Sequence, residues 1–232
     1  MTTIKNNISA IETRLQRAAS DAGRTVSEIL LLAVSKTRTS AQIDEAVAAG
    51  INSFGENYLQ EAIEKISAFP KAKLDWHFIG PIQSNKTRQI PENFAWVHSV
   101  DRLKIAQRLS AQRPATMPPL NICLQVNIDD EPTKAGFKSS DLLAVVAEIA
   151  RLPNLRLRGL MAIPEARKDE QEQRIPFRQL RKLRDEINQS LDNSQKLDTL
   201  SMGMSADLEA AILEQATIVR VGTDIFGPRR TK

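Results

Sequence analysis

The stretch Leu30-Leu31-Leu32-Ala33-Val34, followed by Ser35-Lys36-Thr37, is the strongest local indication of the fold. Its uninterrupted apolar run is short and predicts a buried strand rather than one face of a helix. The apolar run stops at a serine and a lysine, so Lys36 is expected at the carboxyl end of this strand. A lone amine at a strand end is a candidate for chemistry with a carbonyl compound.

Short apolar runs alternate with helical patterns along the rest of the chain. This alternation predicts βαβ units and a parallel sheet. The predicted strands are 29–34, 53–55, 76–79, 95–97, 121–126, 157–161, 199–202 and 218–221. The predicted helices between them include 40–49, 57–69, 101–112, 139–151, 177–189 and 206–215.

Eight such units predict an α/β fold in which residues 1–232 form a single (β/α)8 TIM barrel. An additional N-terminal helix is expected before the first strand and should end near Gly23. Its apolar stripe consists of Ile4, Ile8, Ile11, Leu15 and Ala18. An open doubly wound sheet is the alternative, weakened because no Gly-x-Gly-x-x-Gly motif follows the first strand. The charged segment 164–174 is expected to be a mobile exposed loop.

Composition narrows the class of protein. The chain has 232 residues and a net charge of +4, and only 4% of its residues are aromatic. Its basic residues are scattered among acidic ones, so we expect no nucleic-acid partner. The single cysteine, Cys123, lies in an apolar run and fits a small buried side chain in a reducing compartment. No signal sequence or membrane-spanning stretch is evident, and we expect a cytoplasmic or organelle-matrix protein, with cytoplasmic preferred, that does not bind membranes.

Polar residues stand where the predicted strands end, the side on which barrels carry their sites. Gly203-Met204-Ser205 and Gly222-Thr223 end the seventh and eighth strands, where barrels often hold phosphate. Backbone N–H groups at such turns bind phosphate, and Lys36 can form a Schiff base. Together they predict a site for pyridoxal 5'-phosphate (PLP). The other strand ends carry Glu56-Asn57-Tyr58, Gly80, Ser99, Asp101, Asn127 and Met161.

Several of these residues also have plainer explanations. Lys36 alone would be a solvated loop charge, whereas desolvation at a barrel mouth would lower its pKa and make it nucleophilic. Gly222 would relieve a tight turn. Ser205 and Asn57 stand where helices are predicted to begin and would cap them; capping and phosphate binding use the same N–H groups, so both roles remain open for Ser205.

Three further polar residues, Arg220, His77 and His98, stand in or directly after apolar predicted strands. Arg220 alternates with Val219 and Val221, and parallel strands are buried on both faces, so its guanidinium needs a partner. That partner is either the ring nitrogen of a ligand or an internal carboxylate. His77 lies within a predicted strand and His98 directly follows one, and both are interpreted as structural. Nothing in the sequence clusters into a metal site.

Six motifs resemble those of one family, the pyridoxal phosphate homeostasis proteins, formerly described as proline synthase co-transcribed. The resemblance covers nearly the whole chain in order, and six motifs in one sequence are very specific. The motifs are Ala33-Val34-Ser35-Lys36-Thr37, Phe54-Gly55-Glu56-Asn57-Tyr58, His77-Phe78-Ile79-Gly80-Pro81-Ile82-Gln83-Ser84-Asn85-Lys86, Gly159-Leu160-Met161, Ser201-Met202-Gly203-Met204-Ser205 and Val221-Gly222-Thr223.

The resemblance implies a fold type III PLP-binding barrel, like the N-terminal domain of alanine racemase. It implies that Lys36 holds PLP as an internal aldimine, that Asn57 lies near the ring and that Arg220 faces the pyridine nitrogen. Ser205, Gly222 and Thr223 would bind the phosphate. Family members have no established catalytic activity and are tied to buffering or delivering PLP. The implied partners are PLP and apo PLP-dependent enzymes as recipients, and we expect a monomer.

A PLP-dependent racemase is the first alternative. A two-base racemase needs acid–base groups on both faces of the amino acid. The second domain of alanine racemase, which supplies a tyrosine, has no counterpart in these 232 residues, and Tyr58 belongs to the homeostasis family's own motif. A charged Arg220 also disfavours protonation of the ring nitrogen. We therefore expect no enzyme activity. A class I aldolase-like Schiff-base enzyme on the same barrel is the second alternative.

Overall fold

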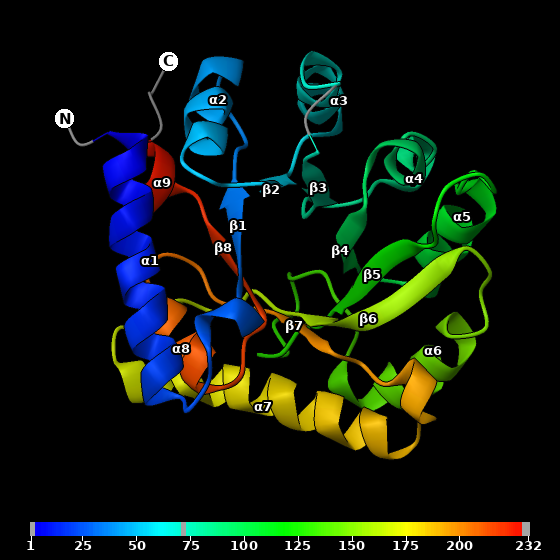
Figure 1. The fold of residues 1–232 in the computed structure, drawn as a ribbon. Helices are drawn as coiled ribbons and strands as arrows, with labels where there is room; N and C mark the ends of the chain where they lie inside the picture. The colour runs from blue at the N-terminus through cyan, green and yellow to red at the C-terminus, as the bar shows by residue number, and fades with distance from the viewer. Residues whose placement is uncertain (1–2, 71–72, 229–232) are drawn as a thin grey trace.

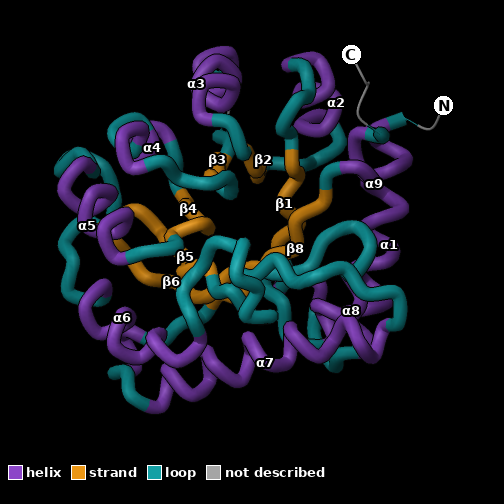
Figure 2. Tube along the Cα trace, turned by 180° about the vertical axis from the view of Figure 1, so that it is seen from behind, coloured by secondary structure: helices purple, strands orange, loops and turns teal. Residues whose placement is uncertain are grey.

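The computed structural model describes residues 3–70 and 73–228. Within them, eight parallel strands follow one another around a closed barrel, and β8 pairs with β1. Helices cover the outside of this barrel (Figures 1 and 2). The predicted (β/α)8 architecture is confirmed, and the open doubly wound alternative is wrong because the strands form a closed ring.

The observed strands agree with the predicted ones, with ends that move by at most three residues. The strands are β1 (Leu30–Val34), β2 (Ser53–Glu56), β3 (Asp75–Phe78), β4 (Trp96–Val100), β5 (Leu120–Gln125), β6 (Leu155–Met161), β7 (Thr199–Ser201) and β8 (Ile218–Val221). Every residue of β2 and β8 is buried, as expected for parallel strands that are covered by helices outside and by packed side chains inside.

The α-helices are α1 (Ile4–Asp21), α2 (Ser40–Ala48), α3 (Leu59–Ala68), α4 (Ile90–Asn93), α5 (Leu103–Gln112), α6 (Leu142–Ile149), α7 (Glu170–Gln189), α8 (Leu208–Leu213) and α9 (Thr223–Phe226). Short 3-10 helices are η1 (Val26–Glu28), η2 (Ser84–Lys86), η3 (Ser139–Asp141) and η4 (Asn193–Gln195). Among the residues described, no helix is both long enough and apolar enough to cross a membrane.

The N-terminal helix α1 completes the outer layer where the last helix of the barrel is short. Its predicted apolar stripe, from Ile4 to Ala18, is buried, and the side chain of Thr3 caps its first turn by accepting from the N–H of Asn6. Helix α9 has only four residues, and α1 packs against α2, α8 and α9 (Figure 1). The helix that precedes the first strand therefore packs against α8 and α9, the helices before and after the last strand.

One helix is longer than the sequence predicts. Helix α7 begins at Glu170 instead of residue 177, so the predicted exposed loop over residues 164–174 ends in helix. The side chain of Asp169 accepts from the N–H groups of Gln171 and Glu172 and starts this helix. Pro176 lies inside the helix, where proline is normally a helix breaker, so the apolar pattern alone indicates a start after it.

Candidate cofactor site at the carboxyl ends of the strands

Lys36 lies just beyond β1 and is half-buried. Hydrogen bonds of its two chain neighbours, Ser35 and Thr37, fix the backbone on either side of it. The N–H of Ser35 donates to the carbonyl of Gly55 at 3.0 Å and so extends the pairing of β1 with β2. Thr37 has φ 63°, a left-handed conformation that is costly for a β-branched residue. Its N–H donates to Oε1 of Glu61 at 2.5 Å, which stabilises this turn.

A buried lysine on α3 secures the same turn. Nζ of Lys65 donates to the carbonyl of Ser35 at 2.6 Å and to Oε1 of both Glu56, at 2.7 Å, and Glu61, at 2.5 Å. Lys65 is 5% exposed and Glu56 is fully buried. Burial raises the pKa of Glu56 above its ordinary value, against the opposing hydrogen bond from Lys65. This cluster was not predicted; its signal in the sequence is the Glu61–Lys65 spacing of four on a helix.

The turn after β7 carries Ser205, which does not cap α8. That helix begins at Leu208, and Asp207 occupies the cap position and accepts from the N–H of Met204 at 2.6 Å. The predicted cap role of Ser205 is therefore wrong, because a turn of chain intervenes before the helix. Gly203 is required in this turn: its φ is +88°, and a Cβ there would lie 2.5 Å from the Cβ of Ala211.

The turn after β8 approaches the strand that leads to Lys36. Thr223 begins α9, and Gly222 occupies the cap position. The first N–H groups of a helix have no partner within the helix and are available to an acceptor. A Cβ on Gly222 would lie 3.3 Å from the carbonyl oxygen of Val34. The turn of Gly222 and Thr223 therefore packs directly against the end of β1.

Arg220 is buried inside the barrel and donates to oxygen atoms of Ser201 on β7 and of Ala162, the residue after β6. Nη1 donates to the carbonyl of Ser201 at 2.5 Å and to its Oγ at 2.8 Å, and Nη2 donates to the carbonyl of Ala162 at 2.9 Å. No carboxylate is hydrogen-bonded to this guanidinium in the part of the chain that the structure describes. Burial lowers the pKa of Arg220 to about 10, partly opposed by Asp207, so the side chain stays charged at neutral pH.

A hydrogen-bonded chain of side chains continues from Arg220 across the barrel. Nδ1 of His98 lies 2.7 Å from Oγ of Ser201, and Nε2 of His98 lies 2.9 Å from Nδ1 of His77. Because β4 and β7 are not neighbours, the bond between His98 and Ser201 must cross the interior. Burial lowers the pKa of His77 to about 3 and that of His98 well below its ordinary value. The lowered pKa values keep both rings neutral at neutral pH, and their link to Arg220 was not predicted.

Asn57 was expected to cap α3, but the helix starts at Leu59 and Tyr58 takes the cap position. Oδ1 of Asn57 is buried and accepts no hydrogen bond from any residue that the structure describes. The turn at Gly80 packs against it: a Cβ on Gly80 would lie 2.6 Å from Cα of Asn57. Asn57 also lines a pocket of about 500 Å³ together with Tyr58 and Lys86. A buried oxygen without a partner indicates room for a donor from a ligand.

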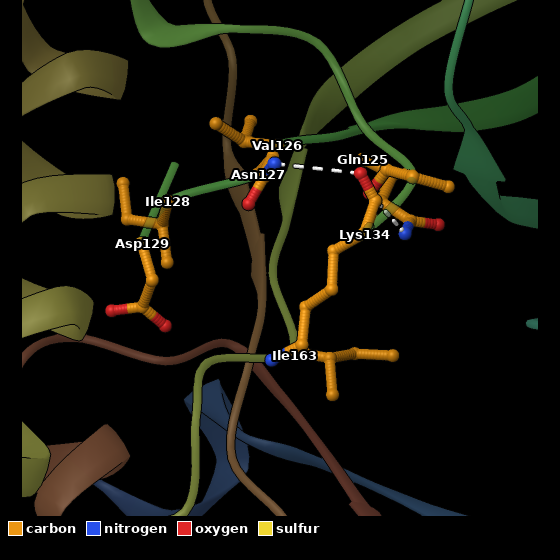
Figure 3. Close-up of a pocket in the computed structure, with 8 residues that line it drawn as sticks. Gln125, Val126, Asn127, Ile128, Asp129, Lys134 and Ile163 are labelled. Atoms are coloured by element: carbon orange, nitrogen blue, oxygen red, sulfur yellow. Dashed lines mark hydrogen bonds between the residues drawn. The ribbon is translucent and has the colours of Figure 1, made fainter. Parts of the chain in front are cut away.

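A smaller pocket of about 230 Å³ lies where β5 ends (Figure 3). Asn127, expected at this strand end, folds the following loop instead: its Nδ2 donates to the carbonyl of Glu131 at 2.7 Å, and its Oδ1 accepts from the N–H of Glu131 at 3.1 Å. The side chain of Lys134 extends along the pocket toward Ile163, and Lys134 pairs with Glu131. Asn127 therefore shapes this pocket through the loop.

The donor set fits PLP. Lys36 provides an amine, the turns of Ser205 and Thr223 provide backbone and hydroxyl donors, and Arg220 provides a buried cation. The structural observation that supports this fit is Oδ1 of Asn57, which is buried and has no hydrogen-bond partner among the described residues. Arg220 lies within β8 and the other residues follow strands, and parallel strands of a barrel present their carboxyl ends on one side.

Comparisons with known proteins agree with this description. The family model of the alanine racemase N-terminal domain matches residues 6–230. The pyridoxal phosphate homeostasis protein of Pseudomonas aeruginosa is 57% identical over 229 residues, which cover 99% of this chain and 97% of that protein. The chain belongs to the pyridoxal phosphate homeostasis protein family. The predicted family resemblance is confirmed.

Solved structures also resemble this chain. PipY of Synechococcus elongatus without PLP is 37% identical with a TM-score of 0.86, and PipY with PLP bound is 36% identical with a TM-score of 0.83. Each comparison covers 97% of this chain and 100% of PipY. An alanine racemase of Clostridium difficile is 12% identical with a TM-score of 0.76, covering 98% of this chain and 58% of the racemase. That last likeness shows the shared fold alone.

Proposed function

We propose that this protein binds PLP covalently through Lys36, as an internal aldimine, and serves PLP homeostasis by buffering or delivering the cofactor. The observation that carries the proposal is the turn around Lys36, which is fixed by hydrogen bonds from the N–H of Thr37 to Glu61 and from Lys65 to the carbonyl of Ser35. The turn of Gly222 and Thr223 packs against the strand end at Val34, directly before this turn. The Pseudomonas aeruginosa relative is named for PLP homeostasis, and PipY has been solved with PLP bound. Both support the same assignment.

The roles of the other residues follow from their chemistry. PLP brings an aldehyde that condenses reversibly with a lysine amine. Ser205, Gly222 and Thr223 bind its phosphate through hydroxyl and backbone N–H donors. Arg220 faces the ring nitrogen, and the buried amide oxygen of Asn57 lies beside the ring. Apo PLP-dependent enzymes are the recipients in this proposal.

Arg220 argues against turnover of amino acids. PLP enzymes that use the ring as an electron sink benefit from a protonated ring nitrogen, and a charged guanidinium opposes that protonation. Arg220 remains charged at neutral pH, and its bonds to Ser201 and Ala162 hold the guanidinium in place. A racemase remains the second candidate because the same fold occurs in alanine racemase.

The covalent assignment is tested by reduction with borohydride. Reduction of the PLP-loaded protein and peptide mapping should place the pyridoxyl group on Lys36. Lys104, an exposed lysine on α5, is the matched control, and Lys104→Ala should leave the yield unchanged. Recovery of the group only on a different lysine would refute the assignment.

Homeostasis and turnover are separated by two further measurements. Mixing the loaded protein with an apo PLP enzyme should restore that enzyme's activity, whereas D- and L-alanine should show no interconversion. Deuterium should not enter the α-position of alanine at enzyme rates. Interconversion on the order of 1–10³ per second, lost in Lys36→Ala, would establish the racemase instead.

A further inference from the structure

Arg14 on α1 contacts both of the turns that follow the last two strands. Its Nε and Nη2 donate to the two carboxylate oxygens of Glu209 at 2.7 and 2.9 Å. Nη1 donates to Oδ2 of Asp224 at 2.9 Å, and Nη2 also donates to the carbonyl of Ser205 at 2.8 Å. One guanidinium therefore joins α1 to the turn after β7, to α8 through Glu209 and to the start of α9 through Asp224.

These contacts lie directly beside the proposed phosphate-binding groups. Ser205 is itself one of them, and Asp224 is the residue next to Thr223. A second bond from the same helix, from Nδ2 of Asn7 to the carbonyl of Ile225 at 2.9 Å, secures the turn after β8. Because α1 packs against α8 and α9, it is the element that holds the two turns in register from outside the barrel.

Charge gives Arg14 a further effect on a bound phosphate. Glu209 and Asp224 place two carboxylates close to the turns that would receive a doubly negative group, and Arg14 pairs with both. Its planar fork fits the carboxylate of Glu209 in two-point contact, which a lysine cannot reproduce. The three side chains are between 34 and 39% exposed, so solvent screens these pairs in part.

We infer that Arg14 is a positioning residue for the phosphate group of the cofactor. It aligns the turns of Ser205 and Thr223 and neutralises the carboxylates of Glu209 and Asp224 next to them. The inference rests on the proposed PLP site and extends it to a helix that stands outside the eight strand–helix units.

The test compares two ligands that share the aldehyde and differ in the phosphate. Dissociation constants for PLP and pyridoxal are measured by absorbance titration of the full-length protein. In Arg14→Met, the ratio of the pyridoxal constant to the PLP constant should fall by about 5- to 10-fold, consistent with loss of two partly exposed ion pairs and a carbonyl contact. Arg14→Lys keeps the charge and should lose less.

Arg17→Met is the matched control. Arg17 is exposed on the same helix and makes no hydrogen bond or ion pair with the described residues, so its loss removes the same charge without the contacts. It should leave the ratio unchanged, and thermal melting without ligand establishes that the variants fold. A wild-type protein that prefers PLP, combined with an unchanged ratio in both Arg14 variants, would overturn the role of Arg14 alone. Equal wild-type affinity for both ligands would overturn the phosphate site and this inference together.

Discussion

Replacing Lys65 with methionine should destabilise the protein and loosen the turn that carries Lys36. The change keeps most of the side-chain volume but removes the ammonium group that contacts Glu56, Glu61 and the carbonyl of Ser35. Glu56 is fully buried, and its Oε2 already lacks a hydrogen bond from the described residues. Removing one partner of a buried ion pair costs about 3–5 kcal/mol.

The cost should be about 3 kcal/mol, the lower end of this range, because Glu56 keeps one hydrogen bond in the variant. Oγ of Ser35 still donates to Oε1 of Glu56 at 2.6 Å and stabilises the carboxylate. For a chain of this size, each kcal/mol lowers the melting temperature by about 2–4 °C, so a loss of 3 kcal/mol corresponds to roughly 6–12 °C. The exposed Lys104 on α5 gives the matched control, and Lys104→Met should change stability by less than about 0.5 kcal/mol.

Urea unfolding followed by circular dichroism measures the loss, and pH identifies its cause. Burial raises the pKa of Glu56, and removal of Lys65 should raise it further. A carboxyl group whose native pKa is raised contributes stability below its unfolded pKa and loses it as pH rises through the native value. The deficit of Lys65→Met relative to the wild type should therefore shrink as pH falls from 8 toward 5.

A second variant separates the buried charge from lost packing. Glu56→Gln in the Lys65→Met background removes the unpaired carboxylate and should recover more than half of the lost stability. A loss below about 1 kcal/mol in Lys65→Met would contradict the buried-pair argument. No recovery in the double variant would contradict it as well.

Three further predictions concern the site and the barrel interior. Lys36→Ala should abolish the aldimine absorbance of the PLP-loaded protein while circular dichroism stays unchanged, and retention of that band would contradict the assignment. Thr223→Ala should weaken PLP binding only modestly, by loss of a charge-assisted bond of about 1.5–3 kcal/mol at most. Gly222→Val should weaken binding more, because a Cβ at this position would lie 3.3 Å from the carbonyl oxygen of Val34. Equilibrium dialysis ranks the two variants, and the reverse order would count against phosphate binding by the turn of Gly222 and Thr223. The pKa of His77 is lowered to about 3, so its native ring stays neutral while the unfolded ring takes up a proton below about pH 6.5. Stability should therefore fall as pH drops from 6.5 toward 3, and His77→Asn should reduce the slope by up to about 1.4 kcal/mol per pH unit in urea titrations; an unchanged slope would refute the linkage.

The strand order and the side of the barrel that carries the site could be predicted from the sequence. Each apolar run is a local signal, and strands that alternate with helices leave few topologies open. Once Lys36 and Thr223 are known to follow strands, the parallel arrangement places both at the same end of the barrel. The motifs that contain them also carry the family resemblance, which the comparisons confirm.

Helix starts were less predictable because the choice among neighbouring polar residues depends on the path of the chain. Ser205 and Asp207 both suit the start of α8, and only the turn after β7 decides that Asp207 takes the position. Asp169 similarly starts α7 before a proline that ordinarily breaks a helix. Such alternatives differ by about 1 kcal/mol, less than the packing of one buried side chain.

The long-range hydrogen bonds that hold the site residues in place were decided by the tertiary structure alone. Lys65, Arg14 and His98 each look like ordinary members of a helix or strand in the sequence. The spacing of four indicates Glu61 as a partner of Lys65, but no local pattern indicates the partners of these three residues on other elements. Lys65 donates to the carbonyl of Ser35, next to Lys36, and Arg14 donates to the carbonyl of Ser205. His98 is hydrogen-bonded to Ser201 across the barrel. Strand propensity and apolar period are properties of neighbouring residues, whereas these bonds join residues brought together only when the barrel closes.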